Sequence, residues 1–280
     1  MPYKDLLVHI DGAGLNGNHI EAALQLAKKH DAHVTGLYVL NQPDVPGYVQ
    51  AQISVDIIER QVMQAVEEAD RLLADFEKQA ASAGLHHDKI LEEGLCDDVL
   101  TARARCVDLL VVGQNNPDLS QYNGDGSLPD RLVLSIGRPV LIVPYVGRYP
   151  VIGENVFVAW DGSRQATRAL NDALPILKLA RKVTVLSINQ PLNGNGATMD
   201  ETPGVEICQH LARHGVKAQA DHVISNDING ADMLLSRAAD SGADLIVMGA
   251  YGHARWREIV LGGFTQHMLA HMTVPVLMAN

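Results

Sequence analysis

Three glycines near the end of the chain have a spacing that suits phosphate binding. They are Gly249, Gly252 and Gly262, within a loop that runs on to Thr265. Glycine lets the backbone approach a ligand closely and reach positive φ. Gly263, Phe264 and Thr265 open the last predicted helix, whose free N–H groups attract anions. A triphosphate would suit this loop, with an added hydrogen bond from the Thr265 hydroxyl. Glycines that only make tight turns are an equal alternative.

Asp161, in the stretch Asp161-Gly162-Ser163, follows an apolar run near the start of the second half. Ligands of open parallel sheets bind beyond the carboxyl ends of the strands, where both this turn and the glycine loop are expected. Asp161 could act as a general base, although an aspartate that binds a ribose hydroxyl needs no such role. We find no Ser-His or Cys-His pair to support covalent chemistry. The P-loop pattern and its lysine are absent.

Other motifs are open to competing interpretations. The histidine pairs His267/His271 and His210/His214 lie four residues apart and could bind zinc, but no carboxylate or cysteine stands at a motif-like spacing beside them. Gly12, Gly14 and Gly17 match G-x-G-x-x-G by letter, without an acidic residue at the end of the next strand. The three cysteines form no C-x-x-C pair. Solvated histidines, a degenerate loop and unpaired thiols are the simpler interpretations.

Charge and hydropathy limit the class of protein. The net charge is −11, with 12 basic against 21 acidic residues up to position 150 and 10 against 12 thereafter. An acidic surface disfavours nucleic acid as a partner. No apolar run is long enough for a membrane span, and the N-terminus does not resemble a signal peptide. We therefore expect a cytoplasmic protein without membrane or nucleic-acid partners.

The chain repeats itself at an offset of 136 residues. Asp108-Leu-Leu-Val-Val-Gly113 recurs as Asp244-Leu-Ile-Val-Met-Gly249, and Pro139-Val-Leu-Ile-Val143 recurs as Pro275-Val-Leu-Met-Ala279. Repeats of this kind are fused structural units. We predict one domain over 1–147 and a second over 152–280, joined by a short linker with two glycines and a proline.

Each half alternates strands and helices. Predicted strands such as Leu109-Leu-Val-Val and Leu245-Ile-Val-Met are continuous apolar runs, typical of a parallel sheet covered by helices on both faces. Asn18-His-Ile-Glu21 reads as a capping box at a helix start, and Thr202-Pro203 as the cap of the second helix in the second half. The strands are expected near 4–10, 34–40, 86–92, 109–112 and 139–144, with helices near 18–30, 54–83, 97–106 and 129–136.

These patterns predict two tandem doubly wound α/β domains, each with a mainly parallel five-stranded sheet flanked by helices. The helix at 54–83 has an apolar stripe that most simply packs on the sheet and could instead serve a partner. The final strand of each half would otherwise leave an exposed apolar edge.

The glycine loop resembles the ATP-binding branch of the universal stress protein family, whose pattern is G-x2-G-x9-G followed by Ser or Thr. Gly249, Gly252 and Gly262 match its glycines, and Val158-Ala-Trp-Asp-Gly-Ser163 resembles the family's opening strand and turn. The resemblance covers nearly the whole chain twice. It implies a Rossmann-like fold of the adenine nucleotide alpha hydrolase type, with the final strands paired as an intramolecular pseudo-dimer. A further homodimer is compatible with it, and no residue argues for one.

The resemblance also implies roles for single residues. Asp161 contacts the ribose or adenine, and Ile188, at the end of the second strand, flanks the adenine. Met248 and Gly249 border the nucleotide. The phosphates are held by Gly252, Gly262, Gly263 and Thr265, and Phe264 between them also belongs to the nucleotide-binding set. Gly263 stands where the family has Ser or Thr, so one hydroxyl is lost, and Thr265 is placed to compensate.

The two repeats are predicted to be unequal. In the first, Asn116 replaces the second glycine and Pro129 stands in place of Thr265, whereas Gly126-Ser127 keeps the third glycine and a hydroxyl. That loop carries Asp118, Asp125 and Asp130 near one arginine, whereas the second carries Arg255, Arg257 and His253 against Glu258. A triphosphate is therefore expected only in the second repeat.

Three functions fit these features. The first is a regulatory or stress-response protein that binds ATP or a related adenine nucleotide, with or without magnesium. The second is a nucleotide-free scaffold or interaction protein, and the third is a slow ATP hydrolase. We expect the protein to have little or no catalytic activity, and at most weak ATP hydrolysis.

Overall fold

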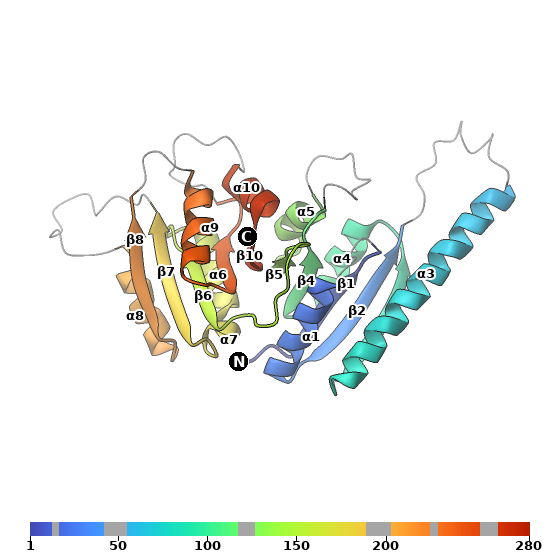
Figure 1. Ribbon diagram of the computed structural model, residues 1–280, viewed down its shortest axis with the longest axis horizontal. Helices are drawn as coiled ribbons and strands as arrows, with labels where there is room; N and C mark the ends of the chain where they lie inside the picture. Colours follow the sequence, from blue (N-terminus) through green and yellow to red (C-terminus); the bar gives the residue numbers. More distant parts are fainter. Residues whose placement is uncertain (13–16, 42–54, 117–126, 189–202, 225–228, 253–262) are drawn as a thin grey trace.

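The computed structural model describes residues 1–12, 17–41, 55–116, 127–188, 203–224, 229–252 and 263–280, without the side chains of 55–58. Its centre is one ten-stranded sheet with helices on both faces (Figure 1). The first repeat comprises β1 (Asp5–Ile10), α1 (Asn18–His30), β2 (His33–Leu40), α3 (Val55–Ser82), β3 (His87–Glu93), α4 (Cys96–Ala104), β4 (Leu109–Gly113), α5 (Leu128–Ser135) and β5 (Val140–Val143).

The second repeat follows the same plan. It comprises β6 (Asn155–Ala159), α6 (Arg164–Asp172), α7 (Leu174–Leu177), β7 (Lys182–Ile188), α8 (Val205–Arg213), β8 (Ala218–Val223), α9 (Gly230–Asp240), β9 (Leu245–Gly249), α10 (Gly263–His271) and β10 (Val276–Ala279). The α/β architecture with two tandem, mainly parallel five-stranded sheets is confirmed. Among the described helices, none is both long and apolar enough to cross a membrane.

The two five-stranded sheets join edge to edge. The strand order is β3-β2-β1-β4-β5-β10-β9-β6-β7-β8, and the β5–β10 pair is antiparallel, with Leu141 opposite Leu277. The other neighbouring strands that pair are parallel. The expected pairing of the two final strands is confirmed, because each covers the apolar edge of the other.

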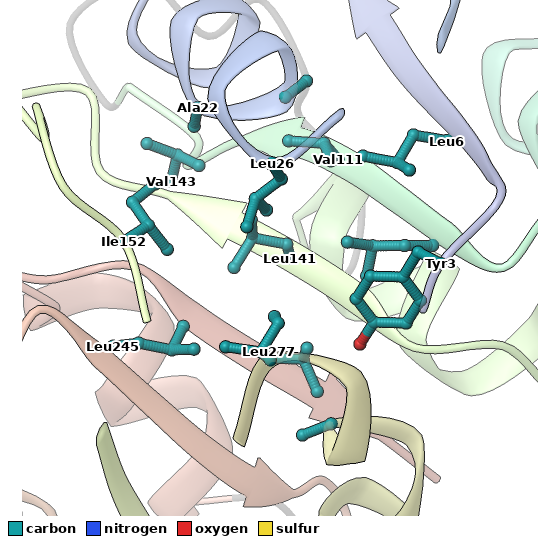
Figure 2. Close-up of a cluster of buried hydrophobic side chains, with 14 of the residues drawn as sticks. Tyr3, Leu6, Ala22, Leu26, Val111, Leu141, Val143, Ile152, Leu245 and Leu277 are labelled. Atoms are coloured by element: carbon teal, nitrogen blue, oxygen red, sulfur yellow. The ribbon is translucent and has the colours of Figure 1, made fainter. Parts of the chain in front are cut away.

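Strands near the centre are buried on both faces. In β4, Leu109 and Val111 point into one core and Leu110 and Val112 into the other, all at 0% exposure. One core lies under α1, α3, α6, α7 and α8, and the other under α4, α5, α9 and α10. Figure 2 shows how the first core crosses the joint, with Leu141 of β5 above Leu277 of β10. The continuous apolar runs in the sequence therefore reflect a three-layer fold.

Hydrogen bonds from side chains to backbone carbonyls also connect the two repeats. The Tyr3 hydroxyl donates to the Asp172 carbonyl over 2.7 Å, and the Gln114 amide donates to the Leu269 carbonyl over 2.8 Å. In Figure 2 the Tyr3 oxygen points away from the first repeat. These bonds attach the N-terminus and the end of β4 to helices of the second repeat.

Helix α3 packs by only part of its apolar stripe. Ala69 and Phe76 are fully buried, and the Phe76 ring covers Gly36 so closely that a Cβ there would lie 2.6 Å from ring carbons. Leu72 is partly buried against the same core, and Ala65 is also partly buried, whereas Val62 is 40% exposed. The side chain of Ile58 lies outside the described residues.

Helix α1 begins at Asn18 as expected, but the capping predicted for α1 and α8 is wrong. Asn18 does not cap α1: the cap residue is Gly17, which has a φ of 56° and no side chain, while the Asn18 amide donates to the Pro144 carbonyl over 3.2 Å. Helix α8 begins at Val205 with Gly204 as its cap residue, so Pro203 is not its first-turn proline. In both cases a glycine at positive φ stands at the cap position, which letter patterns do not reveal.

Candidate functional site

The sheet order creates a switch point between β6 and β9, because the chain continues from β6 to β7 on one side and from β9 to β10 on the other. Ligands of such sheets bind where neighbouring strands diverge in this way. Three described segments meet there: the turn after β6, the end of β9 and the first turn of α10. They contain most of the residues that the sequence predicts as a site.

The turn after β6 presents Asp161 to solvent. Its Oδ1 accepts a hydrogen bond from the Ser163 amide over 2.9 Å, which fixes the carboxylate over the start of α6. The Ser163 hydroxyl accepts from the Ala166 amide over 3.1 Å and so caps that helix. The turn is therefore ordered by its own side chains, with Asp161 at its exposed tip.

Gly249 lies where β9 crosses the start of α6. A Cβ on it would stand 2.4 Å from the Ala166 backbone nitrogen and 2.5 Å from the Gln165 carbonyl carbon. Only glycine allows this approach. The neighbouring Met248 is 2% exposed and its side chain belongs to the core, so only its backbone reaches the site.

Gly252 faces the same helix start more loosely. A Cβ there would stand 3.3 Å from the Gln165 Oε1 and 3.4 Å from the Ser163 Oγ. Its φ does not lie in the left-handed region, whereas that of the preceding Tyr251 does, at 53°. Neither Gly249 nor Gly252 has positive φ, and the close approach of this backbone to a ligand stays a prediction.

The first turn of α10 supplies Gly263, Phe264 and Thr265, and it contains no acidic residue. Thr265 is 4% exposed, and its hydroxyl accepts a hydrogen bond from the Tyr251 amide over 3.2 Å. The Thr265 hydroxyl oxygen thus binds an amide of its own loop, and the hydroxyl proton is still available for donation to a ligand. Gly262 and the charged residues His253, Arg255, Arg257 and Glu258 lie outside the described residues.

Ile188 ends β7 beside the switch point. It is 6% exposed and packs in the core that contains Met248. Of the predicted residues described here, Asp161, Gly249, Gly252 and Thr265 are linked through shared contacts, whereas Ile188 and Met248 contribute mainly apolar packing behind them.

The sequence reasoning missed Gln165 and Tyr251. Gln165 is 7% exposed, lies against both Gly249 and Gly252, and donates to the Asn280 side chain over 3.4 Å. The sequence signal that could have identified Gln165 is its position, as a polar residue next to the apolar Ala166 at the start of a helix. Tyr251 joins the two repeats, which no local pattern shows.

The corresponding place in the first repeat has different chemistry. His19 stands beside Gly113, with its Nδ1 3.3 Å from the position of a Cβ there, and its Nε2 lies 3.7 Å from the Asp11 Oδ1. At α5, Ser127 and Asp130 form a capping box in which the Asp130 carboxylate accepts from the Ser127 amide over 2.9 Å. A carboxylate of the chain itself therefore stands at the helix N-terminus where a phosphate would bind.

A buried Cys-His contact also lies in the first repeat and was not expected from the sequence. The Cys96 Sγ and the His9 Nε2 are 3.5 Å apart. Burial, followed by the nearby Asp97, raises the pKa of the Cys96 thiol to about 12, and burial lowers the pKa of His9 to about 4. Both groups are thus neutral near pH 7, which does not favour a thiolate nucleophile.

Metal binding finds no support in the described part of the chain. No group of three or more His, Cys, Asp or Glu side chains there is arranged to hold a metal ion. His267 instead hydrogen-bonds to Asp232 over 2.6 Å and stacks on His271, whereas the rings of His210 and His214 lie 4.6 Å apart.

Comparison with known proteins agrees with this fold. The sequence model of the universal stress protein family matches residues 2–144 and again 154–280. This chain therefore belongs to the universal stress protein family, and it contains the domain twice. A curated universal stress protein of Synechocystis sp. is 24% identical, with 98% of this chain and 99% of that protein aligned.

Solved structures share the fold over the whole chain. A universal stress protein from Archaeoglobus fulgidus superposes with a TM-score of 0.76 at 16% identity, covering 100% of this chain and 97% of the other. A Pseudomonas aeruginosa PAO1 protein of unknown function gives a TM-score of 0.60 at 14% identity, covering 99% and 92%. At these identities the likeness shows a common fold.

Proposed function

We propose that the chain binds ATP or a related adenine nucleotide in its second repeat, with or without magnesium, and serves a regulatory role in a stress response. The observation that carries the proposal is the meeting of an acid-free helix N-terminus, at α10, with the close-packed backbone at Gly249 and Gly252. Backbone N–H groups in such a place bind phosphate. The proposed domain bounds remain 1–147 and 152–280.

Each residue then has a defined task. The Asp161 carboxylate, held at the exposed end of its turn, accepts hydrogen bonds from ribose hydroxyls. Gly263, Phe264 and Thr265 present amides to the phosphates, with Gly252 allowing their approach and Gly262 completing the pattern. Ile188 and the backbone of Met248 and Gly249 form the apolar side of the adenine subsite.

The direct test is the ligand that accompanies the protein. Mass spectrometry of material released from freshly purified, denatured protein is expected to identify an adenine nucleotide. Calorimetric titration of nucleotide-free protein with ATP, with and without magnesium, then gives the affinity and the stoichiometry. An empty protein whose unfolding temperature does not respond to ATP would reject the proposal and favour the scaffold alternative.

Hydrolysis is a separate question for the same preparation. Magnesium-dependent phosphate release that is lost in Asp161→Asn would favour the hydrolase alternative. We expect release no faster than from a buffer control, because no described residue near Asp161 forms a base-nucleophile arrangement.

A further inference from the structure

Tyr251 lies inside the proposed phosphate loop but has no place in the glycine pattern. It is partly buried and has a φ of 53°, a backbone conformation that residues with a Cβ rarely adopt. Such a conformation persists only when the surroundings hold it. Two hydrogen bonds do so, one from the backbone and one from the side chain.

The backbone bond lies within the second repeat. The Tyr251 amide donates to the Thr265 hydroxyl over 3.2 Å, which attaches the end of β9 to the first turn of α10. Because Thr265 is 4% exposed, its side chain has little freedom to move. The position of Tyr251 and the orientation of the α10 N-terminus are therefore linked.

The side-chain bond leaves the second repeat. The Tyr251 hydroxyl donates to Oδ1 of Asp130, which belongs to α5 of the first repeat. Figure 1 shows α5 and α10 next to each other at the joint between the repeats, and the two helices are in contact. Asp130 is 8% exposed, and its second oxygen accepts from the Ser127 amide, so the acceptor is itself held in place.

Burial, followed by the adjacent Asp130 carboxylate, raises the pKa of the Tyr251 hydroxyl, which therefore stays protonated as a donor. A hydrogen bond to a carboxylate is stronger than one between neutral groups. The first repeat thus supplies a fixed, charged acceptor to the residue that connects β9 with α10.

We propose that Tyr251 is a positioning residue for the phosphate loop and that Asp130 of the first repeat holds it, so the first repeat sets the nucleotide affinity of the second. The inference rests on the proposed function and adds regulation to it. By linkage, nucleotide bound in the second repeat strengthens the contact with α5 by the same factor.

Calorimetry on the full chain tests this coupling with ATP at fixed magnesium. Tyr251→Phe removes the hydrogen bond, and Asp130→Asn replaces its charged acceptor by a weaker, neutral one, so each is expected to weaken binding about 3- to 10-fold. The double variant is expected to bind no more weakly than Tyr251→Phe alone, because both changes act on one interaction. Wild-type affinity in both single variants would overturn the inference.

Two control variants separate positioning from general stability. Tyr3→Phe removes another hydrogen bond between the repeats, which the Tyr3 hydroxyl donates to the Asp172 carbonyl of α6. Tyr3 is far from the phosphate loop in the sequence. Ser127→Ala disrupts the α5 capping box while it leaves the Asp130 carboxylate for Tyr251. Both are expected to bind ATP within about twofold of wild type. A loss of affinity in these controls equal to that in Tyr251→Phe would also overturn the inference.

A second readout needs no nucleotide. Hydrogen exchange at the Tyr251 amide in ligand-free protein is expected to become about 3-fold faster or more in Tyr251→Phe and Asp130→Asn, and to stay unchanged in Tyr3→Phe. Unchanged exchange in the first two variants would refute the positioning role. If wild-type protein binds no ATP, the proposed function fails, and exchange alone decides whether Asp130 holds Tyr251.

Discussion

A methyl group on Gly249 would lie 2.4 Å from the backbone nitrogen of Ala166, closer than any real side chain approaches. Gly252, three residues on, has more room, since its nearest contact is the side-chain oxygen of Gln165 at 3.3 Å. Two glycines of one motif thus have different tasks. The first lets the sheet and α6 come together, and the second keeps the loop surface open.

Substitution separates these tasks. Gly249→Ala is expected to lower the free energy of unfolding by about 3 kcal/mol, because backbone on both sides must shift. Gly252→Val is expected to cost less than about 1 kcal/mol in stability, since the Gln165 side chain can turn aside, but to weaken ATP binding about 10- to 100-fold. Denaturant unfolding and calorimetry measure the two quantities. Wild-type ATP affinity in a folded Gly252→Val protein would show that the phosphate loop is assigned wrongly.

The repeated aspartates before β4 and β9 are expected to differ in their contribution to stability. Asp244 accepts hydrogen bonds from the amides of Gly153, Glu154 and Asn155, whereas Asp108 accepts from those of Lys4 and Asp5. Asp244→Ala is therefore expected to cost about 3 kcal/mol and Asp108→Ala about 1–2 kcal/mol. Urea unfolding of both variants provides the comparison. Equal losses would mean that the linker amides find water or other acceptors.

Much of the fold could be predicted because its causes are local or repeated. The apolar runs of β4 and β9 are continuous because both faces of each strand are covered, and the offset of 136 residues follows from duplication. The pairing of β5 with β10 follows from their apolar edges. The start of α1 was predicted correctly, but its cap was not, because Asn18 bonds to the Pro144 carbonyl, 126 residues away, rather than to its own helix.

The site was predictable only where one segment carries it. Gly249, Gly252 and Asp161 belong to local patterns, so their types and spacing sufficed to place them at the switch point. Gln165 and Tyr251 act through contacts with other segments, and the Tyr251 bond to Asp130 spans 121 residues. The contact between His9 and Cys96 is likewise a product of the tertiary fold.

Acid is expected to destabilise the protein through its buried histidines. His30 is 3% exposed and packs edge-on against Tyr3, and burial, followed by Lys29 and Lys4, lowers its pKa to about 4. The unfolded chain therefore binds a proton more tightly than the folded one between about pH 6.5 and 4. Stability is full above about pH 6.5 and falls as the pH drops through this window, by about 1–3 kcal/mol for this group.

The variant His30→Phe keeps a ring against Tyr3 and cannot titrate, so its stability is expected to fall less between pH 7 and 4. Urea unfolding at a series of pH values measures the slope. His86→Gln, at an exposed histidine, serves as the control and is expected to follow the wild-type curve. A His30→Phe slope equal to that of wild type would place the acid sensitivity elsewhere, with the buried His9 as the next group to replace.

One ATP is expected to bind per chain, in the second repeat. In the first, the Asp130 carboxylate already occupies the N-terminus of α5, and Pro129 in that first turn has no N–H to offer. Arg131, which follows Asp130 in α5, is paired with Asp97. A phosphate there would meet a fixed negative charge, whereas the first turn of α10 has none.

Titration of nucleotide-free protein is expected to give a stoichiometry near one. Asp161→Asn is expected to weaken binding about 10-fold or more, because a charged acceptor is lost, and Asp11→Asn to leave it unchanged. Two equivalent sites, or a single site lost in Asp11→Asn and retained in Asp161→Asn, would reverse the assignment of the repeats.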